Sequence, residues 1–291
     1  MHEYLLSLLL GIIEGLTEFL PVSSTAHLRI TEALLGIDLS DGFWKMYSIV
    51  IQLGAILSLP IYFRSRIARF LSTFPRGEHG DRTAFNHPLT LVMIAFVCTA
   101  VPAFLLTKVI GKHLESLVVM GWSLLIGGII MWIVDALFGR ARPGKRFQTE
   151  RMEEMTMPQA IWIGLCQIAS AVFPGTSRSM STISAGQLVG MSRPAALEFS
   201  FFLSMPTMAA AVAYNLFRTF HPKHEGEPLG RMPVNGLEWG VLIIGFVVSF
   251  IVALAVVAWF MNWVRQRGFM PFAIYRIVVG IAVLAWAMRM A

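Results

Sequence analysis

The sequence predicts an all-α polytopic membrane protein with six transmembrane helices and two shorter re-entrant helix–turn–helix elements. Three observations lead to this fold class: the apolar composition, the number of long apolar stretches, and the position of the arginines between them. Of the 291 residues, 56% are hydrophobic and 14% are charged, and the mean hydropathy is +0.68. Soluble domains carry about 25% charged residues, so this composition indicates a membrane protein.

Six apolar stretches are long enough to cross a bilayer as helices, which takes about 20 residues each. Two polar residues, Gln52 and Glu198, fall inside these stretches and could line a cavity or satisfy broken backbone. The two cysteines are far apart, which does not support a disulfide framework or a metal site with paired cysteines. The stretches are 44–63, 88–108, 117–138, 194–217, 239–264 and 271–288.

Basic residues concentrate in two of the loops, and this predicts which side of the membrane each loop faces. Loops rich in Lys and Arg near span ends stay in the cytoplasm. The loops after the first and third spans are therefore predicted to be cytoplasmic, and the loops 111–116 and 221–238 to face outward. The net charge of +6 is then a topology signal, and no nucleic-acid partner is expected. The basic residues of the two loops are Arg64, Arg66, Arg69, Arg76 and Arg82, and Arg140, Arg142, Lys145, Arg146 and Arg151.

Two segments, 4–36 and 160–191, are left over from the alternation of spans, and each has a proline near its centre. Each must begin and end on one side, so we interpret both as re-entrant, the first entering from outside and the second from the cytoplasm. Their sequences align, GIIEG with GLCQI and LPVSS with FPGTS, with the same spacing from glycine to proline. This predicts an inverted-topology repeat in a single domain, 1–291, with halves 1–138 and 159–291 and both breaks near the bilayer midplane.

The first break has two acids before a proline, and three hydroxyls and a histidine after it. Glu14 and Glu18 are four residues apart, so in a helix they share one face, about 6 Å apart along the axis. Pro21 ends this helix, because proline lacks an N–H and clashes with the preceding turn. The hydroxyls at 23–25 can cap a second helix that runs through His27. Acids, a hydroxyl and an imidazole are groups that hydrolysis uses.

The second break combines a glycine, hydroxyls and an arginine at the start of a helix. Gly175 permits a tight turn. The free N–H groups and the positive end of the helix dipole form an anion site. Arg178 adds a planar fork that suits bidentate contact with phosphate. The predicted phosphate-binding residues are Gly175, Ser177, Arg178, Ser179 and Thr182.

Five stretches resemble one family of bacterial envelope enzymes. EGLTEFLPVSSTAH at 14–27, IQLGAI at 51–56, PGTSRSMSTIS at 174–184, EFSFFLSMP at 198–206 and PFAIYR at 271–276 are similar to the undecaprenyl-diphosphate phosphatases associated with bacitracin resistance. The resemblance spans the chain and implies a hydrolase that removes the terminal phosphate of the C55 isoprenyl diphosphate, regenerating the monophosphate carrier for cell-wall synthesis. It also implies divalent-cation dependence, the bacterial inner membrane, and an active site facing the periplasm.

The motifs of the family fall on this sequence without a departure. The acidic motif maps onto Glu14 and Glu18, and the hydroxyl and histidine of the first break map onto Ser24 and His27. The PGxSRSxxT motif maps onto Pro174, Gly175, Ser177, Arg178, Ser179 and Thr182.

We expect a mechanism with three parts. Arg178 and the following helix start hold phosphate oxygens and stabilise charge in the transition state. Glu14 and Glu18 hold a divalent cation, Mg²⁺ or Ca²⁺, or one of them relays protons. Ser24 or His27 is the nucleophile and the other its helper, and direct attack by water stays open.

A transporter is the competing interpretation. Inverted repeats and broken helices are also transporter architecture, and a lipid-phosphate flippase would use Arg178 as well. The expected partners are a prenyl diphosphate lipid and the membrane lipids. The sequence does not fix the oligomeric state, which leaves a homodimer open.

Overall fold

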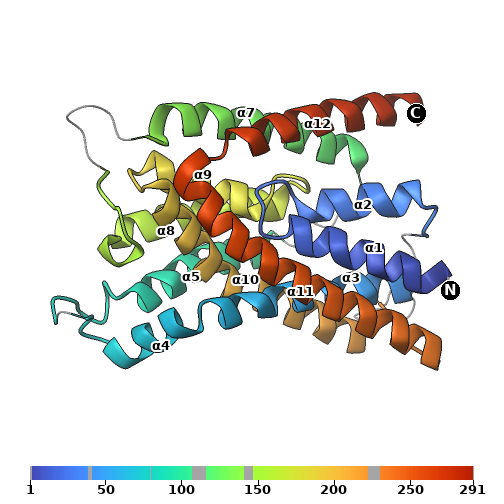
Figure 1. The fold of residues 1–291 in the computed structure, drawn as a ribbon, viewed down its shortest axis with the longest axis horizontal. Coiled ribbons are helices and arrows are strands. Elements are labelled where there is room, and N and C mark those ends of the chain that lie inside the picture. Colours follow the sequence, from blue (N-terminus) through green and yellow to red (C-terminus); the bar gives the residue numbers. More distant parts are fainter. Residues whose placement is uncertain are drawn as a thin grey trace. The chain divides into compact units, whose positions relative to one another are not determined.

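The regular secondary structure is helical, apart from one isolated bridge between Thr149 and Met191, in the residues that this computed structural model describes (Figure 1). These are residues 2–38, 41–78, 80–106, 116–140, 147–221 and 230–290. The helices are α1 (His2–Thr17), α2 (Ser24–Leu34), α3 (Gly42–Tyr62), α4 (Arg64–Thr73), α5 (Pro88–Leu105), α7 (Leu117–Phe138), the 3₁₀ turn η1 (Met152–Glu154), α8 (Met157–Val172), α9 (Arg178–Leu188), α10 (Arg193–Phe220), α11 (Gly236–Arg267) and α12 (Met270–Met290).

Within the described part of the chain, six helices are long and apolar enough to cross a membrane, which confirms the six predicted spans: α3, α5, α7, α10, α11 and α12. Helices α10 and α11 run a few residues beyond the predicted stretches, because their polar ends continue the helix past the apolar part. The predicted positions Lys108, Arg142, Lys145, Arg146 and Lys223, and most of the turn 111–116, lie outside the described residues.

The chain forms two compact units. Unit 1 contains Met1–Phe19, Ser24–Tyr62 and Ser204–Ala258, and unit 2 contains Leu20–Ser23, Phe63–Leu203 and Trp259–Ala291. The tip of the first break, Leu20–Ser23, therefore belongs to the same unit as the whole second break.

The two leftover segments are helix–break–helix elements, as predicted. In each, a helix of 16 residues (α1 or α8) precedes the break and a helix of 11 residues (α2 or α9) follows it. The paired helices pack against each other, α1 on α2 and α8 on α9. At about 1.5 Å of rise per residue, the longer helix of each pair is about 24 Å long, shorter than a hydrocarbon core of about 30 Å. The re-entrant course of these elements, their inverted relation and the sides from which they enter the membrane stay predictions.

A serine with positive φ directly precedes the second helix of each element. Ser23 has φ 75° before α2, and Ser177 has φ 69° before α9. Positive φ is uncommon for residues other than glycine and persists only where the surroundings enforce it. The sequence alignment matches Ser24 with Ser177. By backbone conformation, the residue equivalent to Ser177 is Ser23, because both have positive φ directly before the second helix. The shift of one residue arises because the second break has one more residue after its proline, where Gly175 takes φ +93°.

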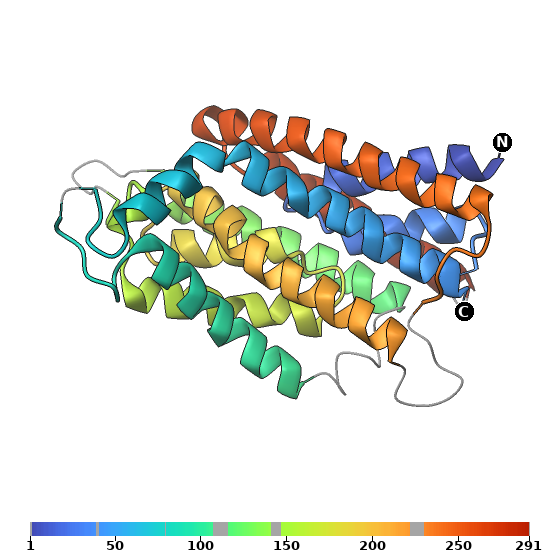
Figure 2. The ribbon, with the colours of Figure 1, turned by 90° about the horizontal axis from the view of Figure 1, so that it is seen from below.

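In unit 1, helices α1 and α3 pack closely on α11 through glycines (Figure 2). A Cβ at Gly15 of α1 would lie 2.8 Å from the carbonyl oxygen of Ser249, and a Cβ at Gly54 of α3 would lie 2.5 Å from that of Phe246. Small residues at helix contacts, which let backbones approach, are a common packing device in membranes. The Oγ of Ser249 also donates to the carbonyl of Ile51 at 2.7 Å.

In unit 2, α7 lies beside α12, and α8 packs on both α5 and α9 (Figure 1). The buried carboxylate of Asp135, near the end of α7, connects several elements. Arg193 of α10 donates to it from Nε at 2.7 Å and from Nη2 at 2.8 Å. Gln187 of α9 donates at 2.9 Å, and the backbone N–H of Phe269 donates at 3.1 Å. This network fixes the C-terminal end of α9, the helix whose first residue is Arg178.

Candidate functional site

The two acids of the first break lie one helical turn apart, as predicted. Glu14 is inside α1, and the backbone N–H of Glu18, just past the last residue of α1, donates to the carbonyl of Glu14 at 2.9 Å. Both residues are buried, with exposed fractions of 1% and 7%. Placing a charged group in a membrane segment costs free energy. Two carboxylates buried to this degree in an apolar chain therefore indicate a functional role.

Ser24 is coupled directly to one of these acids. Its Oγ donates to Oε2 of Glu18 at 2.5 Å. Ser24 is the first residue of α2 and is buried, while His27 lies three residues further along α2 and is half-buried. A carboxylate that accepts a hydrogen bond from a hydroxyl is placed to take its proton. The geometry therefore gives Ser24 the contact that an activated nucleophile needs.

The second break presents the start of α9. Ser177 caps this helix, and its Oγ accepts from the N–H of Met180 at 3.4 Å. Arg178, the first residue of α9, is half-buried. Ser179 is 1% exposed, and its Oγ has no hydrogen-bond partner among the described residues. A buried hydroxyl of this kind at a helix N-terminus is suited to an anionic ligand.

Gly175 meets two requirements that only glycine satisfies together. Its φ is +93°, and a Cβ there would lie 2.8 Å from the carbonyl oxygen of Met120. Thr182, by contrast, already uses its hydroxyl within the fold. Its Oγ1 donates to the carbonyl of Arg178 at 3.0 Å and lies 2.7 Å from Oγ of Ser200 on α10. Thr182 thus joins α9 to α10, and its predicted contact with phosphate stays a prediction.

One residue that sequence reasoning left without a role, Arg276 of α12, connects the two breaks. Its Nη1 donates to the carbonyl of Pro21 at 3.1 Å. Its Nη2 lies 3.1 Å from the carbonyl of Gly175 and 2.9 Å from that of Thr176. The Nη2 also lies 3.1 Å from the carbonyl of Ser123 on α7. All these residues belong to unit 2, so the backbones of both breaks share one guanidinium.

The sequence contains one indication that Arg276 has a function, namely its position inside an apolar span. A charged residue in a membrane segment is a candidate functional residue, because it is costly to bury there. The same signal applies to Asp135, which serves the network at the end of α7. Glu198 accepts from Nε of Arg66 at 2.7 Å and so ties α10 to α4, while its predicted place in the reaction cavity stays a prediction.

The predicted cation ligands are a pair rather than a cluster. The described residues include no group of three or more His, Cys, Asp or Glu side chains that could hold a metal ion. Mg²⁺ is commonly held by one or two carboxylates together with substrate phosphates. Glu14 and Glu18 supply two buried carboxylates, so they fit this mode of binding.

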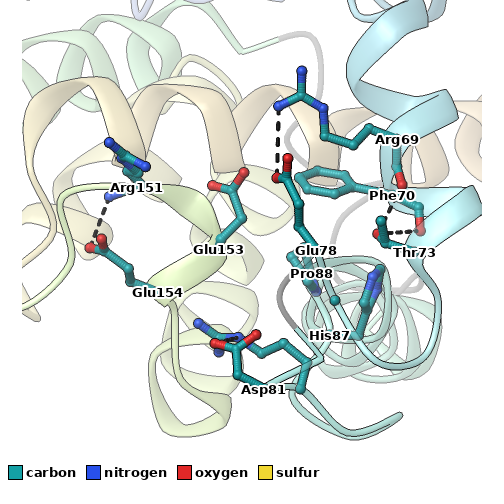
Figure 3. A pocket seen from close by; sticks show the side chains of 12 residues that line it. Arg69, Phe70, Thr73, Glu78, Asp81, His87, Pro88, Arg151, Glu153 and Glu154 are labelled. Carbon is teal, nitrogen blue, oxygen red and sulfur yellow. Dashed lines mark hydrogen bonds and ion pairs between the residues drawn. The ribbon is translucent and has the colours of Figure 1, made fainter.

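A charged pocket of about 250 Å³ lies elsewhere in unit 2, between α4, the following loop and η1 (Figure 3). Its charges pair locally: Arg69 lies 3.9 Å from Glu78, and Arg82 lies 3.8 Å from Asp81. None of the predicted catalytic or phosphate-binding residues lines this pocket. We therefore do not assign it to the reaction.

Comparison with known proteins gives full-length similarity. The family model for bacitracin resistance protein BacA matches residues 7–282. An undecaprenyl-diphosphatase of Koribacter versatilis is 67% identical over 290 residues, which cover 99% of this chain and 100% of the relative. Undecaprenyl-diphosphatases of Caldanaerobacter subterraneus and Thermus thermophilus are each 38% identical, with coverage of 98% and 94% of this chain and 96% and 93% of the relatives.

Proposed function

Because this chain belongs to the bacitracin resistance protein BacA family, we propose that it is an undecaprenyl-diphosphatase. It hydrolyses undecaprenyl diphosphate to undecaprenyl phosphate and inorganic phosphate. This recycles the lipid carrier of cell-wall synthesis and confers bacitracin resistance. The observation that carries the proposal is the identity of 67% over the full length of a relative with this activity in its name. The two breaks supply the groups that such a reaction needs.

The second break binds the diphosphate in this proposal. The N-terminus of α9 offers backbone N–H groups and the positive end of a helix dipole. Arg178 supplies a bidentate contact to phosphate oxygens, and the buried Oγ of Ser179 supplies a further hydrogen bond. Donors fixed in an apolar surrounding stabilise the charge that develops in the transition state more strongly than they would in water.

The first break supplies the nucleophile. The Oγ of Ser24 attacks the terminal phosphorus while its proton passes to the carboxylate of Glu18, its hydrogen-bond partner. The bond from that phosphorus to the bridging oxygen breaks, and the lipid monophosphate leaves with this oxygen. Water then attacks the phosphoserine and releases inorganic phosphate. His27 assists these proton transfers as a general acid or base.

Glu14 and Glu18 also hold the divalent cation in this proposal, Mg²⁺ or Ca²⁺. A bound cation would neutralise charge on the diphosphate. Both acids are buried on neighbouring turns beside Ser24, so they would supply two carboxylates to an ion bound there.

The protein lies in the bacterial inner membrane with the two arginine-rich loops in the cytoplasm and the active site open to the periplasm. The bias of basic residues supports this orientation. The matched helix lengths of the two broken elements, 16 and 11 residues in both, support an inverted repeat.

Replacing Arg178 by Ala should lower the rate of phosphate release from undecaprenyl diphosphate by on the order of 100- to 1,000-fold, the loss typical of one donor to transition-state charge. Lys at this position should recover only part of the rate, because it lacks the bidentate fork. The matched control is Arg64→Ala, since Arg64 is also the first residue of a helix but is exposed. A near-normal rate in Arg178→Ala would exclude the phosphate site at α9.

Glu14→Gln and Glu18→Gln remove charge and keep shape, so each should raise the concentration of Mg²⁺ or Ca²⁺ that gives half-maximal activity. We expect a rise of at least about 10-fold, the lower end of the losses seen even for outer-shell partners of metals. Glu3→Gln is the control, an exposed acid on the same helix. If both cation titrations match that of the wild type, the carboxylates serve proton transfer and hold no ion.

Orientation can be measured with single cysteines in a background where Cys98 and Cys166 are replaced. Ser65→Cys, on the exposed face of α4, should be protected from a membrane-impermeant thiol reagent in cells with a permeabilised outer membrane. Val234→Cys, which is 77% exposed in the loop before α11, should be labelled. The reverse pattern would place the arginine-rich loops outside and overturn the periplasmic active site.

A further inference from the structure

We propose that Arg276 is a positioning residue for hydrolysis: its guanidinium holds the two breaks in their reactive shape without touching the substrate. The inference rests on the proposed phosphatase function and goes beyond it, because it assigns the role to a residue outside both breaks. All the backbone groups that the guanidinium contacts belong to unit 2.

The hydrogen bonds of Arg276 are divided between the two breaks. Nη1 serves Pro21 in the first break, and Nη2 serves Gly175 and Thr176 in the second. Nη2 has only two hydrogens but faces three carbonyl oxygens, including that of Ser123, so at least one of these bonds is shared. A planar fork with nitrogens on two sides can serve both breaks at once, whereas the single nitrogen of a lysine cannot.

The guanidinium is unusual because the hydrogen bonds that it makes to the described residues go to backbone carbonyls. Arg276 is 0% exposed and is the largest of the fully buried side chains. It has no ion pair with a carboxylate among the described residues, and its Nε has no hydrogen-bond partner there. A buried charge without an acid partner is costly, so its presence indicates that the irregular carbonyls need it. Both terminal nitrogens already donate to backbone carbonyls and the side chain is fully buried, so we assign Arg276 to the backbone of the breaks and not to the phosphate.

The carbonyls that Arg276 holds lie next to the strained residues of the breaks. Pro21 is two residues before Ser23, and Thr176 directly precedes Ser177. These are the two serines with positive φ, a conformation that persists only under constraint. Ser23 is followed by Ser24, and Ser177 by Arg178, so loosening the clamp misplaces the groups that react. Such misplacement lowers kcat more than it raises KM.

Gly127 of α7 offers a way to disturb the guanidinium without changing Arg276. A Cβ at this position would lie 2.4 Å from Nη2 of Arg276. The added Cβ would also lie 2.7 Å from Cε of Met180, the flexible end of a side chain on α9. Alanine at 127 must therefore push on the guanidinium, and the comparison in a background that lacks Arg276 separates this effect from that of Met180. Gly121 provides the matched control on the same helix, since its Cβ would instead meet the side chain of Leu284 on α12 at 2.8 Å.

The test compares Arg276→Lys, Arg276→Met, Gly127→Ala and Gly121→Ala, each purified in detergent, by kcat and KM for phosphate release and by thermal midpoint. Arg276→Lys and Gly127→Ala should each lower kcat by on the order of 100-fold with KM changed by less than about threefold. Gly121→Ala should keep kcat within about twofold. In the Arg276→Met background, Gly127→Ala should change kcat by less than about twofold, because both changes act through one group. If Arg276→Met does not fold, Arg276→Lys replaces it in this comparison.

Three results would overturn the positioning role: a normal kcat in Arg276→Lys, equal losses in Gly127→Ala and Gly121→Ala, or independent effects of Gly127→Ala and the change at Arg276. Gly127→Ala and Gly121→Ala could both lower the thermal midpoint. If kcat falls only in Gly127→Ala, the loss of activity comes from positioning and not from general destabilisation. The wild-type rate distinguishes the two proposals. A wild type that releases no phosphate refutes the phosphatase function, whereas an active wild type with unaffected variants refutes only the role of Arg276.

Discussion

One buried guanidinium satisfies the backbone at both places where the helical pattern of this protein breaks. In a membrane, carbonyl groups that leave a helix must find partners inside the protein. Arg276 donates to Pro21 in the first break and to Gly175 and Thr176 in the second. The backbone of the breaks can therefore leave the helical conformation. This makes the N–H groups at the start of the second helix accessible to a ligand and changes the direction of the side chains at the break. The chemistry of the protein depends on this constraint.

The two breaks have complementary chemistry. Around the first, Glu14, Glu18 and Ser24 form a buried acidic group with a hydroxyl bonded to one carboxylate. At the second, Arg178 and Ser179 stand at the start of α9, which is anchored along its length. Thr182 connects this helix to α10, and the Asp135 network holds its far end. A rigid support for the proposed phosphate site fits the need for donors that do not reorganise during reaction.

Much of the fold could be predicted from sequence because it depends on length and hydropathy. Six spans and two proline-centred breaks follow from apolar runs of about 20 residues and from the missing N–H of proline. The one-residue shift between the breaks could not be predicted, since it results from the φ of Gly175 and Ser177. The partners of Arg276 were also out of reach, because backbone carbonyls leave no side-chain pattern. Asp135 and Glu198 were visible as charges in apolar spans, but their arginine partners are distant in sequence.

The most direct test of the account is the fate of undecaprenyl diphosphate with the purified wild-type protein. In detergent, where no second leaflet exists, a phosphatase should release one inorganic phosphate for each undecaprenyl phosphate formed. We expect this stoichiometry, and we expect release to stop when a chelator removes the divalent cation and to resume when the cation is restored. Unchanged lipid in detergent, together with movement of the diphosphate lipid between leaflets in proteoliposomes, would contradict the account and identify a flippase.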